Sequence, residues 1–234
     1  MYRNLDAHKT LATVEQLERR IGERFPDAGL HRVCGELRTI ATESKARTEW
    51  IAQPNFMLRG AVTGVLAVLV AALAYSLSLL EFSLNAITAT ELVQALDAVM
   101  NEIVLIGAAV FFLVSGERRI KRARALGALH ELRSIAHVID MHQLTKDPGR
   151  LRGDGPSTPS SPRRAMSAFE LTRYLDYCSE MLSLTGKLAA LYAQGLNDDV
   201  VVGAVNEVET LTTSLARKIW QKIVILERLQ DADG

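Results

Sequence analysis

Apolar residues recur at helical spacing in two stretches at the start of the chain. The first stretch ends at Pro26 and carries Leu11, Val14, Leu17, Ile21 and Phe25. The second ends at Pro54 and carries Leu30, Val33, Leu37, Ile40, Trp50 and Ile51. Because proline ends or kinks a helix, this pattern predicts two helices that form a hairpin within residues 1–55.

Two uncharged runs follow. Residues 60–80 match the roughly 20 residues with which a helix crosses a hydrocarbon core of about 30 Å, although a helix buried inside a soluble domain is the alternative. The second run, residues 103–116, is shorter, but the capping box Thr88-x-x-Glu91 predicts a longer helix that enters it. We therefore predict a segment 56–116 with spans at about 58–80 and 97–116, joined by an acidic outer loop at 81–96.

Charge predicts the orientation of these spans. The stretch 81–102 contains acidic residues and neither Lys nor Arg, whereas a basic cluster follows the second span: Arg118, Arg119, Lys121, Arg122 and Arg124. The positive-inside rule places this cluster in the cytoplasm, and with it both termini. Trp50 and Phe56 are predicted to anchor the first span at the same interface. The expected location is the inner (plasma) membrane, with two passes.

Helical spacing resumes after the basic cluster. Residues 117–146 are predicted to form an extension helix with an apolar side made of Leu129, Leu132, Ile135, Ala136 and Ile139. Asp147, Pro148 and Gly149 end it, and residues 147–165, which hold four of the six prolines, are predicted to be a flexible linker.

Residues 166–234 are predicted to form an antiparallel helical hairpin. Ser167-x-x-Glu170 is a second capping box, and the helix that it opens closes at Gly195. Asn197 is predicted to cap the next helix. The first helix carries a heptad seam, and its surplus of apolar positions indicates packing against further helices. The seam comprises Leu171, Tyr174, Cys178, Met181, Thr185, Leu188 and Tyr192.

Composition supports an all-α fold and narrows the possible partners. Aromatic residues make up 6% of the chain, which leaves little material for a β-rich fold. The 27 basic and 27 acidic residues cancel, so the chain has no global basic footprint for nucleic acid. The two cysteines, Cys34 and Cys178, form neither a disulfide framework nor a four-cysteine zinc site, and they are predicted to be buried. No cofactor is expected.

Small residues line one side of the first span. In lipid, such a stripe lets two helix backbones approach closely, which favours helix association. Two alternatives stay open: packing on the second span of the same chain, or contact between copies in a homo-oligomer. The stripe comprises Gly60, Gly64, Ala67, Ala71, Ala74 and Ser78.

The second span has a polar edge near its outer end. Asp97, Asn101 and Glu102 lie close in sequence, and intramembrane acids are costly unless they face water or a partner. In a ring of subunits they would form an acidic collar that attracts cations at the mouth of a pore. The alternative is that they snorkel into the headgroup region.

A third group of polar residues lies on the extension helix. His130, Arg133, His137 and Asp140 are predicted to form a hydrogen-bonded stripe that faces a neighbouring helix or a cytoplasmic vestibule. A zincin motif fails because Ser134 stands where the second histidine is required. No metal site is therefore predicted.

Three hypotheses of function follow. The first is a non-enzymatic, homo-oligomeric channel or pore-like assembly with cytoplasmic helical domains, because two spans cannot enclose a water path alone. The second is a membrane-tethered interaction module that binds a cytoplasmic protein through its C-terminal hairpin. The third is a membrane-bound metal-dependent enzyme around His137, although no enzyme signature is present. Each hypothesis has membrane lipids as partners.

Overall fold

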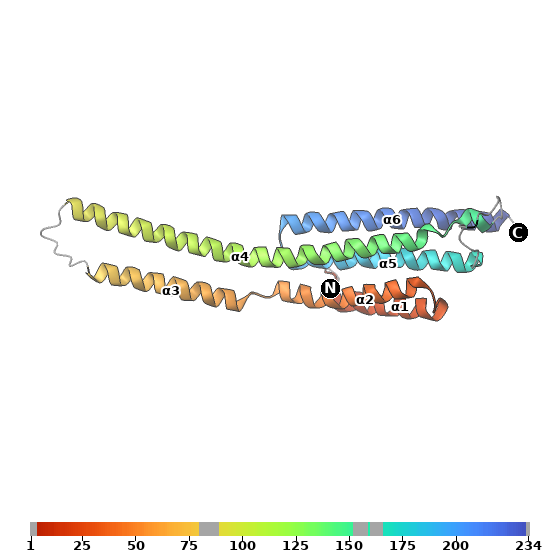
Figure 1. Cartoon of the computed structure of the whole chain (residues 1–234), viewed down its shortest axis with the longest axis horizontal. Helices are drawn as coiled ribbons and strands as arrows, with labels where there is room; N and C mark the ends of the chain where they lie inside the picture. Colours follow the sequence, from red (N-terminus) through yellow and green to blue (C-terminus); the bar gives the residue numbers. More distant parts are fainter. Residues whose placement is uncertain (1–3, 80–88, 152–158, 160–165, 233–234) are drawn as a thin grey trace. The chain divides into compact units, whose positions relative to one another are not determined.

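The chain is all-helical over the residues that the structure describes. The structure is a computed structural model, and it describes residues 4–79, 89–151, 159 and 166–232. Within these ranges it contains helices and no strand (Figure 1), which confirms the all-α part of the predicted fold class. The elements are α1 (Ala7–Arg24), α2 (Gly29–Ala52), α3 (Phe56–Leu79), α4 (Ala89–Leu144), the short 3-10 helix η1 (Pro148–Leu151), α5 (Ala168–Gly195) and α6 (Asp199–Ala232).

These elements fall into two compact units. One unit, which we call the bundle, combines Met1–Ala52 with Arg122–Gly234, and the other, which we call the helix pair, comprises Gln53–Lys121. α4 contributes to both, because its residues up to Lys121 belong to the helix pair and the remainder to the bundle. The predicted segments 1–55, 117–146 and 166–234 therefore share one unit almost completely.

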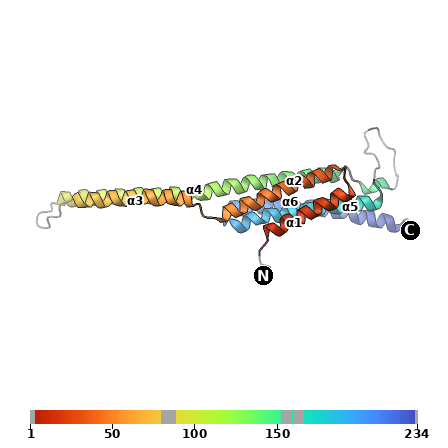
Figure 2. The same cartoon turned by 90° about the horizontal axis from the view of Figure 1, so that it is seen from below.

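The bundle is organised around α5. α5 and α6 form an antiparallel hairpin, and α1 and α2 form a second one that packs against α5 (Figures 1 and 2). All seven positions of the predicted seam on α5 are buried, as is the predicted apolar side of the extension helix on α4. Packing of α5 against α1, α2 and α6 accounts for its surplus of apolar positions. Both cysteines are buried and unpaired.

Of the two predicted caps that the structure describes, one is confirmed and one is wrong. At α5 the amide of Glu170 donates to Ser167 Oγ at 3.2 Å, and the amide of Ser167 donates to the Glu170 carboxylate at 2.8 Å, which confirms the capping box. At α6 the prediction of Asn197 is wrong. Asp198 is the cap, because its Oδ1 accepts from two backbone amides of the first turn at 3.1 and 3.2 Å. Its carboxylate also accepts two hydrogen bonds from Arg122, and a charged acceptor binds a guanidinium more strongly than a neutral amide does.

The segments outside the long helices differ in part from the prediction. Residues 89–96 of the predicted outer loop are helical, since α4 begins at Ala89, and this agrees with the helix predicted to start at the first capping box. Thr88 of that box lies outside the described residues. Pro148–Leu151 forms a 3-10 helix where a linker without secondary structure was expected. Proline is tolerated at the first position of a helix because its missing N–H would have no intrahelical partner there. Most of 152–165 lies outside the described residues.

One helical segment among the described residues is long and apolar enough to cross a membrane by length and composition. It is Val99–Leu144 within α4, whose most apolar window of 18 residues has a mean hydropathy of 2.0 and is not buried. α3 contributes a shorter apolar stretch, Arg59–Ala72. These helices alone do not establish two membrane spans.

Candidate functional site

The three polar residues predicted at a pore mouth lie on two sides of α4. Asp97 and Asn101 are exposed, whereas Glu102 is half-buried together with Val99 and Ile106. Successive helical residues are rotated by about 100°, so Glu102 points away from Asn101. In a unit of two helices the half-buried side is the one that the other helix shields. Asp97 and Asn101 therefore share an outward face that Glu102 does not join.

The stripe of small residues on α3 is exposed in a single chain. All six members are exposed, while the half-buried positions of the described part of α3 include Val62, Leu66 and Leu69. A Cβ atom added at Gly60 or Gly64 would have no heavy atom within 4 Å. The two glycines of the stripe therefore have no close neighbour in a single chain.

A polar cluster ties together the two ends of the helix pair at its base. The Glu117 carboxylate accepts a hydrogen bond from the amide of Asn55 at 3.2 Å and pairs with Lys121 Nζ at 2.9 Å. Lys121 Nζ also donates to the carbonyl of Gln53 at 2.8 Å. Hydrogen bonds from Lys121 and then Asn55 lower the pKa of Glu117. This cluster holds the chain segment that leads into α3, and no sequence motif predicts it.

Part of the predicted basic cluster makes structural contacts in the bundle. Arg122 binds Asp198 at 2.6 Å, and these contacts lower the pKa of Asp198. The guanidinium of Arg124 lies 3.9 Å from the ring centre of Trp50, which is half-buried. Trp50 is thus occupied by a cation–π contact inside the bundle, although it was predicted as a membrane anchor. Phe56, the other predicted anchor, is exposed.

The predicted cytoplasmic stripe is mostly exposed and divided between two contacts. Arg133 binds Glu207 of α6 at 3.3 Å, and Asp140 accepts from Gln143 Nε2 at 2.6 Å. His130 and His137 are exposed. Among the described residues no group of three or more His, Cys, Asp or Glu side chains is placed to hold a metal ion.

His142 is half-buried in the bundle, and the sequence did not single it out. Its Nδ1 lies 3.4 Å from the hydroxyl of Tyr174, beside a hollow of about 480 Å³. Burial lowers the pKa of His142, and the charges of Lys146 and Arg32 lower it further. Helical spacing could have predicted this burial, because His142 follows the core residue Ile139 by three residues and so lies on the buried side of α4.

Known proteins offer no analogue for these arrangements. No protein-family model matches the chain, and comparison with curated proteins and with solved structures finds no similar protein. Function is therefore inferred from residues and geometry.

Proposed function

We propose that the chain is a two-span membrane protein whose copies assemble around a water-filled path for cations. The outward position of Asp97 and Asn101 is the observation that carries this proposal. An acidic side chain facing hydrocarbon costs about 3 kcal/mol near the bilayer centre, and less towards its edge. A shared water path removes that cost.

The surface of the helix pair supports a membrane environment. Large apolar side chains stand exposed along both helices, and a surface of this kind on a protein in water marks an interaction site or an aggregation hazard. In lipid the same side chains are well solvated. α3 has 24 residues, which at 1.5 Å per residue gives about 36 Å, enough for a hydrocarbon core of about 30 Å. The exposed side chains include Val65, Val68, Val70, Tyr75, Ile103, Val104, Leu105, Phe111 and Phe112.

Assembly of several copies follows from the number of spans. Two helices cannot enclose a water path, so permeation requires copies arranged around an axis. The open stripe on α3 offers the close backbone contact by which membrane helices associate. In the proposed arrangement Gly60 and Gly64 contact another copy, and the outward face of α4 lines the path. The positive-inside rule places both termini in the cytoplasm.

The first test is the mass of the purified complex in nanodiscs, measured by native mass spectrometry. We expect an oligomer, and a monomer would overturn the proposal. The second test is cation flux into liposomes for Asp97→Asn and Glu102→Gln, which remove one charge each from opposite sides of the same helix. We expect a several-fold loss for Asp97→Asn and a smaller one for Glu102→Gln. Flux unchanged in Asp97→Asn would overturn the placement of the path.

A membrane-tethered interaction module is the second candidate. The observation in its favour is that the bundle has a continuous core of its own, drawn from α1, α2, α4, α5 and α6. A fragment that begins at Ser161 and contains only the C-terminal hairpin is a poor test of this candidate, because it lacks the α1 and α2 surfaces that cover α5. The full chain is the better probe. A monomeric, flux-inactive protein that still binds a partner through the bundle would favour this candidate over the channel.

A further inference from the structure

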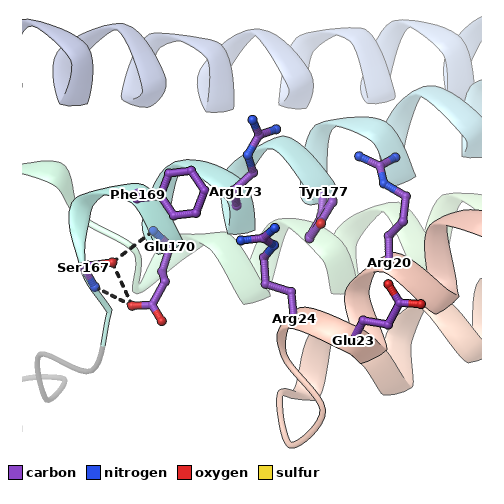
Figure 3. A pocket seen from close by; sticks show the side chains of 8 residues that line it. All are labelled: Arg20, Glu23, Arg24, Ser167, Phe169, Glu170, Arg173 and Tyr177. Atoms are coloured by element: carbon purple, nitrogen blue, oxygen red, sulfur yellow. Dashed lines mark hydrogen bonds between the residues drawn. The ribbon is translucent and has the colours of Figure 1, made fainter.

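A hollow of about 760 Å³ opens in the bundle between the end of α1 and the start of α5 (Figure 3). Its volume lies in the range of small-molecule sites, about 300–1,000 Å³. Three arginines line it, Arg20 and Arg24 from α1 and Arg173 from α5. Two aromatic rings, Phe169 and Tyr177, lie among them (Figure 3). The lining thus combines three cationic and two aromatic side chains, and it also includes the acidic Glu23 and Glu170.

The aromatic rings position the guanidinium groups without using their hydrogen-bond donors. The Arg24 guanidinium lies 5.3 Å from the ring centre of Phe169, and that of Arg173 lies 5.8 Å from the same ring. Phe169 is 55% exposed, so it stands at the opening of the hollow rather than in the core. A guanidinium held by a cation–π contact keeps its N–H groups available for an anion.

The three arginines differ in how far carboxylates neutralise them. Arg20 forms a bidentate ion pair, because it donates two hydrogen bonds to Glu180 at 2.8 and 3.2 Å. Arg173 makes one longer contact, at 3.3 Å, with Asp176. Arg24 donates to no carboxylate among the residues that the structure describes. The available positive charge is therefore centred on Arg24 and Arg173.

The lining also holds two acidic residues, Glu23 and Glu170, so the three arginines leave it with an excess of one positive charge. The Glu170 carboxylate accepts from the amide and the hydroxyl of Ser167 at 2.8 and 2.9 Å, and these bonds lower its pKa (Figure 3). The Glu170 carboxylate thus caps α5, and the charge of Arg24 also lowers its pKa. Glu23 is exposed to solvent. A ligand with two or more negative charges on one group suits two neighbouring guanidinium forks, and phosphoryl oxygens match their geometry.

We propose that this hollow binds the phosphoryl group of a small soluble compound. Arg24 is the principal ligand, Arg173 supplies the second guanidinium, and Arg20 is fixed by Glu180 as a supporting charge. The site lies wholly within the bundle, so the inference does not depend on the proposed pore.

The test uses the full chain in nanodiscs of zwitterionic phosphatidylcholine, titrated with inorganic pyrophosphate in a calorimeter. We expect saturable binding to the unaltered protein and a loss of affinity of at least about tenfold in Arg24→Ala/Arg173→Ala. The matched control is Arg133→Ala/Arg217→Ala, which removes two exposed guanidinium groups elsewhere on the bundle. It should bind like the unaltered protein. Absence of saturable binding, or an equal loss in the control, would overturn the proposal.

Further measurements test whether the variants are folded and which kind of phosphoryl compound binds. Circular dichroism checks that the double variant is folded, and Arg24→Lys provides a milder change that keeps the charge but removes the planar fork. We expect Arg24→Lys to bind pyrophosphate more weakly than the unaltered protein, and unaltered affinity would contradict the role of Arg24. Nanodiscs that contain phosphatidic acid distinguish the source of the phosphoryl group. If this lipid competes with pyrophosphate, the site takes a lipid headgroup and not a soluble compound.

Discussion

The bundle and the helix pair place the same kind of side chain in opposite environments along one helix. On α4, Leu132 belongs to the bundle and is fully buried, whereas Leu105 belongs to the helix pair and is 62% exposed. The bundle buries its apolar residues against its own helices, as a protein in water does. The helix pair leaves its apolar residues outside, where they suit lipid or another copy. The same apolar helix pattern can therefore belong to a buried core or to an exposed helix surface, and the packing around the helix determines which.

Glycines and ion pairs show the same contrast. A Cβ added at Gly186 of α5 would lie 3.0 Å from Thr212 Oγ1 of α6, so two helices approach closely there. A Cβ added at Gly64 would meet nothing within 4 Å. Ion pairs between helices occur at several places in the bundle, such as Arg47 with Glu131 at 2.7 Å. In the described part of the helix pair, ion pairs are confined to the base cluster around Glu117.

The largest expected effect comes from truncating the same side chain in both environments. We expect Leu132→Ala to lower the free energy of unfolding of the bundle by about 2–5 kcal/mol, because it leaves a cavity in the core. Leu105→Ala should change it by less than about 0.5 kcal/mol. The measurement is denaturant unfolding in detergent, followed by tryptophan fluorescence. Both tryptophans, Trp50 and Trp220, belong to the bundle, so the signal reports on that unit.

Leu105→Ala also serves as the control, since it removes the same atoms from the same helix. Equal losses in the two variants would contradict the contrast between the units. That result would mean that Leu105 is buried in the assembled protein and contributes to the stability of the bundle.

A smaller effect is expected from adding a side chain to the two glycines. Gly186→Val should destabilise the bundle by about 1–3 kcal/mol, because α5 and α6 must separate to accept the methyl groups. Gly64→Val should leave bundle unfolding unchanged and lower the mass of the complex in nanodiscs, since it occupies the proposed contact between copies. Tryptophan fluorescence and native mass spectrometry read out the two effects separately. If the Gly64→Val variant forms an oligomer of unchanged mass, the stripe is not part of the interface between copies.

Sequence patterns predicted the helices well because their signals are local. Pro26 and Pro54 mark the ends of α1 and α2, and the contacts of Ser167 with Glu170 span three residues. The apolar spacing on α5 likewise identified its buried side without knowledge of the partner helices.

Packing between distant segments was not predictable in this way. Arg24 and Arg173 reach one hollow from α1 and α5, and no motif connects them. Helical spacing sets Glu102 apart from Asp97 and Asn101, but the sequence does not show which of these positions is half-buried. The cap of α6 was missed by one residue because Asn197 and Asp198 are both good capping residues. The ion pair with Arg122, a residue far away in the chain, favours Asp198.

The third prediction concerns the neighbouring residues Asn197 and Asp198 at the start of α6. Asp198→Ala should destabilise the bundle by about 1–2 kcal/mol, because α6 loses its cap and Arg122 its carboxylate. Asn197→Ala, at the position that the sequence favoured, should have little effect. Asp199→Ala removes an exposed carboxylate from the first turn of α6 and controls for charge alone. Thermal unfolding of the three variants ranks them, and a loss in Asn197→Ala as large as that in Asp198→Ala would restore the original assignment of the cap.

The smallest expected effect concerns the dependence of bundle stability on pH through His142. Its pKa is lowered in the folded chain, mainly by burial and then by Lys146 and Arg32, whereas in the unfolded chain it is close to the ordinary value of about 6.5. Between the two pKa values the unfolded state binds more protons, so stability falls as pH drops from about 6.5 through the lowered pKa. We expect the melting temperature to decrease from about pH 7.5 to about pH 5.5, and His142→Gln to reduce that decrease. His137→Gln, an exposed histidine on the same helix, should not. Equal slopes for His142→Gln and the unaltered protein would show that the burial of His142 does not link proton binding to folding.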